Sequence, residues 1–122
     1  MVGTVLVTGA AGFIGSHVVR ELLGQGFVVR ATVRNPRDAE FLKGLTGAEN
    51  LEIVQMDLLE RESIDAAVAG CEDVIHCAAA LYVGAKDPQR EVVDPSIQGT
   101  QNLLDAIDAG GGINRLIHTS SV

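Results

Sequence analysis

Glycines at positions 9, 12 and 15 stand between an apolar run and an amphipathic stretch, and this arrangement constrains the fold most strongly. The apolar run is Val5-Leu6-Val7, and the amphipathic stretch extends from Phe13 to Leu23. A glycine-rich turn between a strand and a helix lets backbone amides approach a phosphate, because no side chain stands in the way. An ordinary strand-to-helix turn is the alternative, but the flanking strand and helix favour a dinucleotide-binding site.

Apolar runs alternate with helix-period segments along the whole chain, which is typical of an α/β fold. We expect strands over residues 2–8, 27–34, 51–55, 73–78 and 116–119, and helices over 13–25, 37–45, 61–69 and 87–109. Nearly all-apolar strands predict a parallel sheet covered on both faces. Right-handed crossovers then give a Rossmann-type doubly wound sheet with strand order 3-2-1-4-5. The 122 residues suffice for one domain, over 1–122, and we expect the fold to be incomplete after the fifth strand.

Charge and composition exclude several classes of protein. The net charge is −7 and the pI is near 4.7, so no basic surface is expected to bind nucleic acid. No apolar span reaches membrane length and no leader precedes the first strand, so we expect a cytoplasmic protein that does not enter a membrane. Cys71 and Cys77 are expected to be reduced thiols. The three histidines have no ligand spacing, so we predict no metal site.

Arginines rather than acids follow the second predicted strand. A site for NAD places a carboxylate about twenty residues after the glycines, where it binds the ribose hydroxyls. This chain has Arg34 there, and Arg37 follows within one short turn. A guanidinium pairs with a ribose 2′-phosphate that a carboxylate would repel, so the pattern favours NADP over NAD. A solvated arginine at a strand end is the alternative interpretation.

Three further segments follow predicted strands and therefore lie at the same edge of the sheet. Asp57 follows the third strand, where it accepts from the adenine amino group or caps the next helix. The small residues Ala78, Ala79 and Ala80 let the backbone pass close to the ribose, although tight packing also favours them. At the end of the fifth strand, the hydroxyls of Ser120 and Ser121 either bind a substrate oxygen or cap a turn.

Taken in order, these motifs resemble the amino-terminal half of an extended short-chain dehydrogenase/reductase of the NAD-dependent epimerase/dehydratase superfamily. The chain is most similar to the dihydroflavonol reductase and cinnamoyl-CoA reductase-like branch. The segments that carry the resemblance are residues 7–16, 29–36, Asp57-Leu58, His76-Cys77-Ala78-Ala79, Lys86-Asp87-Pro88, residues 94–100 and Thr119-Ser120-Ser121.

The resemblance implies roles for individual residues. Those lining the pyrophosphate are Gly9, Ala11, Gly12, Phe13, Ile14 and Gly15. By the same resemblance Arg34 binds the 2′-phosphate, Asp57 and Leu58 flank adenine, and Ala78, Ala79 and Ala80 flank the ribose. From its position one short turn on, Arg37 is expected to support Arg34. Ser121 matches the catalytic serine that hydrogen-bonds the substrate oxygen. The family also implies a homodimer formed through the helix over 87–109.

One element of the family's catalytic machinery is missing from these residues. The family has a tyrosine four residues before a lysine, downstream of the serine, and the lysine lowers the pKa of the tyrosine. Tyr82 and Lys86 have this spacing, but they precede Ser121 and are not expected to be catalytic. We therefore expect these 122 residues to bind cofactor without catalysing turnover.

Three functions remain open on the sequence. The first is the cofactor-binding half of an NADP(H)-dependent oxidoreductase that acts on a carbonyl or secondary alcohol of a small organic substrate. The second is a non-catalytic dinucleotide-binding module or sensor. The third is an NAD-dependent sugar-nucleotide epimerase or dehydratase, which the lack of an acid after the second strand disfavours.

Overall fold

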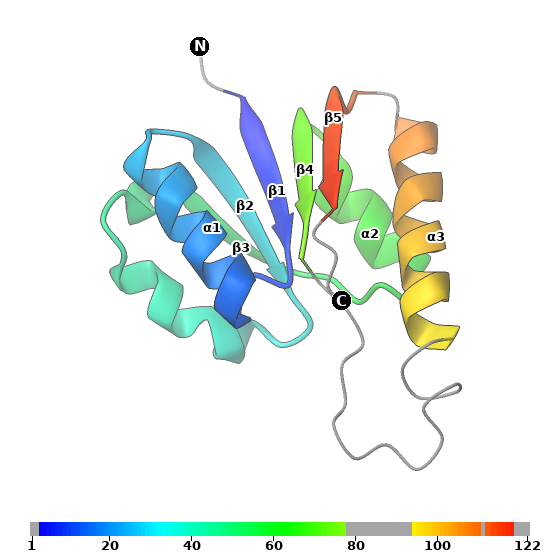
Figure 1. Ribbon diagram of the computed structural model, residues 1–122, viewed down its shortest axis with the longest axis horizontal. Coiled ribbons are helices and arrows are strands. Elements are labelled where there is room, and N and C mark those ends of the chain that lie inside the picture. Colours follow the sequence, from blue (N-terminus) through cyan, green and yellow to red (C-terminus); the bar gives the residue numbers. More distant parts are fainter. Residues whose placement is uncertain (1–2, 78–93, 111, 119–122) are drawn as a thin grey trace.

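The computed structural model describes residues 3–77, 94–110 and 112–118, and its centre is a five-stranded parallel sheet (Figure 1). The strand order is β3-β2-β1-β4-β5, which confirms the predicted Rossmann-type topology. The strands are β1 (Thr4–Thr8), β2 (Val28–Val33), β3 (Leu51–Gln55), β4 (Asp73–His76) and β5 (Arg115–His118). The helices are α1 (Phe13–Gly24), α2 (Arg61–Val68) and α3 (Asp94–Gly110), with 3-10 helices η1 (Pro36–Gly44) and η2 (Ala48–Asn50).

The central strand β1 contributes to two separate cores, one on each face of the sheet. Val5 and Val7 belong to the core that α1 and η1 cover. Leu6 belongs to the opposite core, under α2 and α3 (Figure 1). Successive side chains of a strand point to opposite faces, so a strand covered on both sides must be apolar at every position. The unbroken apolar run in the sequence has this physical cause.

Among the described residues, element boundaries agree with the sequence-based expectations to within a few residues. The predicted strand residues 2, 78 and 119 lie outside the described part of the chain. β1 begins at Thr4, because its first partner is Val28 at the start of β2. β2 in turn begins after Phe27, whose backbone N–H donates to the carbonyl of Leu22 in α1 at 3.0 Å. α3 is described from Asp94, so the predicted helical residues 87–93 lie outside the described part of the chain.

The segment predicted as a helix over 37–45 is a 3-10 helix from Pro36 to Gly44. Its buried residues, Ala39 and Leu42, are three positions apart, which is the spacing at which 3-10 side chains align. Asn35 caps its start, because the side-chain oxygen accepts the N–H of Arg37 at 3.1 Å. This short helix covers the sheet beside the point where β2 ends.

Arg30 is a charged residue in the middle of β2 that ties the sheet to the end of α2. Its Nη1 donates to the carbonyls of Ala67 at 2.7 Å and Ala69 at 2.6 Å, and its Nε contacts Glu52 Oε1 at 2.6 Å. These carbonyls lie at the carboxyl end of α2, where no following turn of the helix supplies an N–H donor. Nη1 also lies 3.4 Å from Cys71 Sγ, and burial raises the pKa of that thiol although Arg30 opposes the rise.

Candidate functional site

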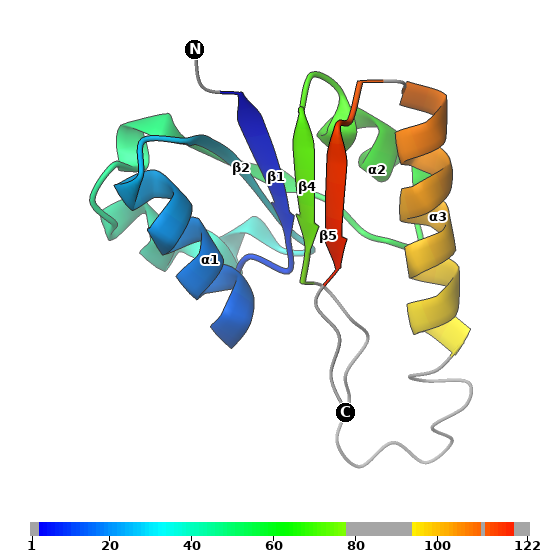
Figure 2. The ribbon, with the colours of Figure 1, turned by 45° about the horizontal axis from the view of Figure 1, so that its top comes forward.

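All five strands end at one edge of the sheet, and both α1 and α3 begin there. The arrowheads in Figures 1 and 2 point to this edge, and α3 runs back in the opposite direction. In open parallel sheets, ligands bind outside the carboxyl ends of the strands, where the strand order reverses. Here the reversal falls between β1 and β4.

The turn between β1 and α1 has the tight geometry that its glycines predict. Gly9 has φ of +64°, a left-handed conformation that favours glycine. Its carbonyl accepts the N–H of Gly12 at 3.1 Å. A Cβ at Gly15 would overlap that same carbonyl oxygen and lie 3.0 Å from Ala10 Cα. The first turn of α1 therefore packs directly on the loop, at a distance that only glycine permits.

Backbone amides at the start of α1 are left open to an incoming anion. Gly12 occupies the N-cap position, so no side chain caps the helix, and the first turn has no acidic residue. Phe13 and Ile14 are 81% and 56% exposed. The first amides of a helix have no intrahelical acceptor, and the helix dipole makes this end positive. The loop thus fits a pyrophosphate group by its shape and by its charge.

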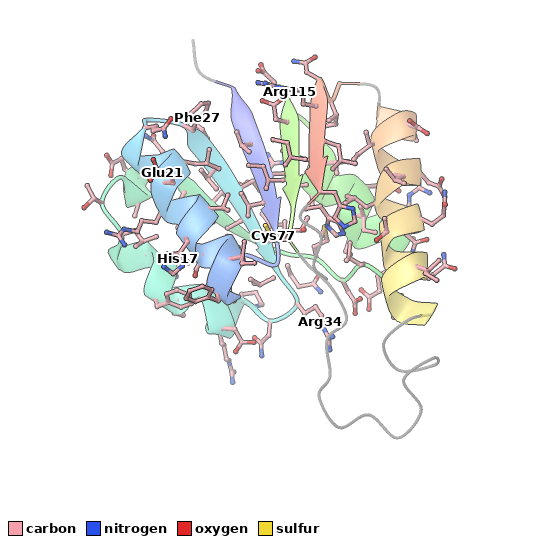
Figure 3. All side chains as sticks on the ribbon, in the orientation of Figure 1. His17, Glu21, Phe27, Arg34, Cys77 and Arg115 are labelled. Atoms are coloured by element: carbon pink, nitrogen blue, oxygen red, sulfur yellow. The ribbon has the colours of Figure 1, made fainter. Side chains whose placement is uncertain are left out.

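Arg34 lies directly beyond the carboxyl end of β2 (Figure 3). It is exposed, and among residues 3–77, 94–110 and 112–118 its side chain has no hydrogen bond or ion pair. Arg37 is exposed as well and follows the Asn35 cap within the first turn of η1. Both residues are thus exposed at the edge where β2 ends, and their binding to a phosphate stays a prediction.

Asp57 and Leu58 follow β3 at the same edge and form a tight turn. Asp57 Oδ1 accepts the N–H of Leu59 at 2.9 Å, so the carboxylate closes the turn on itself. The N-cap of α2 is Glu60, which makes no side-chain capping bond. The helix-cap interpretation of Asp57 is therefore wrong, because the carboxylate stabilises the turn that precedes the helix.

Thr8 and His76 form a buried link between the ends of β1 and β4, and sequence reasoning missed it. Thr8 Oγ1 lies 2.7 Å from His76 Nδ1 and accepts the backbone N–H of Cys77 at 3.0 Å. Burial, with a smaller contribution from His118, lowers the pKa of His76 to about 4, so the imidazole is neutral at pH 7. Figure 3 shows Cys77 at the end of β4. The start of the glycine loop and the end of β4 are thus joined by this contact.

Several predicted site residues lie outside the described part of the chain. They are Ala78, Ala79, Ala80 and Ser121. Tyr82 and Lys86, which were not expected to be catalytic, lie outside it as well. The structure does bring together the glycine loop, the arginines after β2 and the turn after β3. Within residues 3–77, 94–110 and 112–118, no three His, Cys, Asp or Glu residues are grouped as metal ligands. No helix in that same part of the chain is both long and apolar enough to cross a bilayer.

Comparison with known proteins agrees with this arrangement. Residues 5–122 match the model of the NAD dependent epimerase/dehydratase family. A cinnamoyl-CoA reductase from Medicago truncatula is 43% identical, over 97% of this chain and 37% of the relative. A dihydroflavonol 4-reductase from Callistephus chinensis is 41% identical, over 97% of this chain and 34% of the relative.

A solved structure of Gre2 from Candida albicans in complex with NADPH superposes with a TM-score of 0.87 and 31% identity. The superposition covers 97% of this chain and 37% of that one. The chain thus spans about a third of the length of the relatives that it matches. On the match of the family model, the glycine loop and the sheet topology, the chain belongs to the NAD dependent epimerase/dehydratase family.

Proposed function

We propose that this chain is the NADP(H)-binding part of an oxidoreductase that acts on a carbonyl or secondary alcohol of a small organic substrate. The observation that carries the proposal is the contact of Gly15 with Gly9, which brings the uncapped start of α1 onto the loop. Two relatives about 40% identical are reductases, which supports the reaction class. When bound, NADPH supplies the hydride for such a reduction.

Each part of the edge has a role in this proposal. The amides of the glycine loop and the first turn of α1 hold the pyrophosphate. The Asp57-Leu58 turn flanks adenine, and residues 78–80 flank the ribose. Ser121 hydrogen-bonds the substrate oxygen, and its hydroxyl orients that oxygen for proton exchange. No Tyr-x-x-x-Lys follows Ser121 within these 122 residues, so we expect them to bind cofactor without turnover.

The preference for NADP over NAD rests on Arg34. Its exposed guanidinium stands at the end of β2, where a carboxylate would bind unphosphorylated ribose. The solved neighbour with NADPH supports the same choice. A guanidinium binds a phosphate through paired charge-assisted hydrogen bonds, which NADH cannot form because it has no 2′-phosphate.

A pair of arginine variants tests the function and the cofactor preference together. We expect Arg34→Ala to weaken NADPH binding about 10- to 100-fold, the loss typical of hydrogen bonds to a charged group, and to leave NADH binding nearly unchanged. Arg20→Ala, which removes an exposed arginine from α1, should change neither affinity. Calorimetry on each folded variant measures the affinities for NADPH and NADH. Equal losses for NADPH and NADH would refute the assignment of Arg34, and no binding of either cofactor would refute the function.

The proposal extends to assembly and location. Ile97 and Leu104 on α3 are 64% and 38% exposed, which supports a homodimer through this helix. Sedimentation of Ile97→Glu beside the unaltered chain tests this point, because a charge on a buried dimer interface should yield monomers. We expect the thiols of Cys71 and Cys77 to be reduced, which is usual in the cytoplasm, and the proposed location is therefore cytoplasmic.

A further inference from the structure

Asn102 of α3 contacts the turn after β3 through a hydrogen bond that joins distant parts of the chain. Its Nδ2 donates to the carbonyl of Leu58 at 2.7 Å, across 44 positions of sequence. Asn102 Oδ1 accepts from Gln98 Nε2 at 2.8 Å. A carbonyl can only accept, so the bond to Leu58 fixes which atom of the Asn102 amide is the nitrogen. The Gln98 bond then holds the amide in that orientation.

Gly99, one helical turn before Asn102, brings α3 against the same turn. A Cβ at Gly99 would lie 2.9 Å from Leu58 Cβ and 3.3 Å from its Cδ1. Any side chain there would therefore displace Leu58. Leu58 packs against the core that includes Leu103 of α3. The turn is thus fixed by one hydrogen bond and by one close contact, both from α3.

The other bonds of the turn are local. Asp57 Oδ1 bonds the N–H of Leu59, and Ser63 Oγ lies 3.0 Å from both the N and the O of Asp57. These bonds give the turn its shape, but they come from residues 57–63 themselves. They do not connect Leu58 to the rest of the fold. That connection is made by β3, which precedes the turn and pairs with β2, and by the contacts with Asn102 and Gly99 of α3.

We infer that Asn102 and Gly99 are positioning residues for the adenine end of the cofactor site. They act through Leu58, and neither needs to touch the nucleotide. This inference rests on the proposed function, in which the Asp57-Leu58 turn flanks adenine. A turn held before the ligand arrives loses less conformational freedom on binding, so loosening it lowers affinity.

The test uses adenosine 2′,5′-bisphosphate, which contains the adenine end of NADPH alone. We expect Asn102→Ala to weaken its binding about three- to tenfold, as for the loss of one neutral hydrogen bond. In the free protein, the amide of Leu59 should exchange its hydrogen faster. Gln101→Ala is the matched control, because Gln101 is exposed on the same helix and bonds only Asp105, at 2.8 Å, within the described residues. It should change neither quantity.

A double-mutant cycle separates positioning from general loss of stability. If Asn102 acts through the turn, then Asp57→Ala should cost much less affinity in the Asn102→Ala background than in the unaltered chain. Additive losses would overturn the inference, and so would unchanged exchange at Leu59. Gly99→Ala serves as a second variant with the same expected signature. Alanine favours a helix over glycine, so a loss of binding there reports displacement of the turn.

Failure of the inference and failure of the proposed function are distinguishable. If the unaltered chain binds neither NADPH nor adenosine 2′,5′-bisphosphate, the proposed function is wrong. Asn102 and Gly99 then have no role in positioning an adenine site. The exchange rate at Leu59 still decides whether α3 holds the turn. If the unaltered chain binds and Asn102→Ala binds equally well, only the positioning role is refuted.

Discussion

Thr8 Oγ1 and His76 Nδ1 are 2.7 Å apart, in a buried contact between the carboxyl ends of two neighbouring strands. The same hydroxyl accepts the backbone N–H of Cys77 at 3.0 Å. Gly9 follows Thr8 directly, so this contact joins the start of the glycine loop to the end of β4, in addition to the backbone pairing of the two strands.

Thr8→Val removes that hydroxyl while nearly preserving the shape of the side chain. The variant loses the hydrogen bond from the Cys77 amide and the contact with His76 Nδ1. We expect the free energy of unfolding to fall by about 1–3 kcal/mol, because a buried hydroxyl that makes both contacts is removed. Urea denaturation measures this change. Thr8→Ser keeps the hydroxyl and should recover most of the loss, whereas equal losses for Ser and Val would show that the methyl group matters and the hydroxyl does not.

Stability should depend on pH through His76. Burial lowers its pKa from 6.5 to about 4 in the folded chain. Between these values the unfolded chain binds a proton that the folded chain does not, so the free energy of unfolding falls as pH is lowered from 6.5 toward 4. Above pH 6.5 the His76 ring is neutral in both states, so it no longer changes the free energy of unfolding with pH. Between pH 6.5 and 4 that free energy changes by at most about 1.4 kcal/mol per pH unit.

His76→Gln should flatten this dependence, as measured by urea denaturation at several pH values. His17→Gln removes an exposed histidine from α1 and should leave the dependence in place. The ring of His118 lies beside that of His76, with centroids 5.0 Å apart and planes tilted by 39°, and it contributes to the lowered pKa of His76. An identical slope in His76→Gln and the unaltered chain would contradict the assignment.

Gly15→Ala tests the phosphate loop. The added Cβ would lie 2.8 Å from the carbonyl carbon of Gly9 and would overlap its oxygen. Helix and loop must separate, and we expect NADPH affinity to fall by about tenfold or more, in line with the cost of overpacking. Gly24→Ala is the matched control in the same helix, because a Cβ there meets nothing within 4 Å. It should bind normally and gain up to about 1 kcal/mol in stability. Normal NADPH binding by Gly15→Ala would show that the close approach is not required.

Arg30→Met should destabilise the fold more than the loss of a surface ion pair. Methionine keeps an unbranched apolar stem but removes the donor of the Ala69 carbonyl, and it leaves the Ala67 carbonyl with only the weak contact from Cys71 Sγ at 3.5 Å. We expect a loss of about 1.5–3 kcal/mol in thermal or urea unfolding. Arg61→Met removes an exposed pair with Asp65 at 2.9 Å and should cost at most about 0.5 kcal/mol. Comparable losses in both variants would mean that Arg30 does not stabilise the end of α2.

The parts of this structure that follow local rules could be predicted from the sequence. The strand order follows from apolar runs that alternate with helical periods, and the start of α1 follows from the glycines that precede it. β3 has the predicted bounds, Leu51 to Gln55. The helical type of η1 could not be predicted, because a short segment with few apolar residues has too weak a period to distinguish 3-10 from α geometry.

Contacts between distant residues were not predictable. Thr8 and His76 are 68 positions apart, and Asn102 and Leu58 are 44 apart. No local pattern indicates which polar side chains meet across strands or between a helix and a turn. Gly99 is a glycine within a helical segment, which is a sign that another element packs closely against α3. The sequence does not indicate that this element is the turn at Leu58.

The hydrogen bond from Asn102 to Leu58 couples α3 and the nucleotide site in both directions. Thermodynamic linkage is symmetric. If an ordered α3 increases the affinity for a nucleotide, then the bound nucleotide stabilises α3 by the same free energy. Binding at the adenine end should therefore slow the fraying of α3, through Leu58 and Asn102. Substitutions along that helix become a means of tuning cofactor affinity from outside the binding surface.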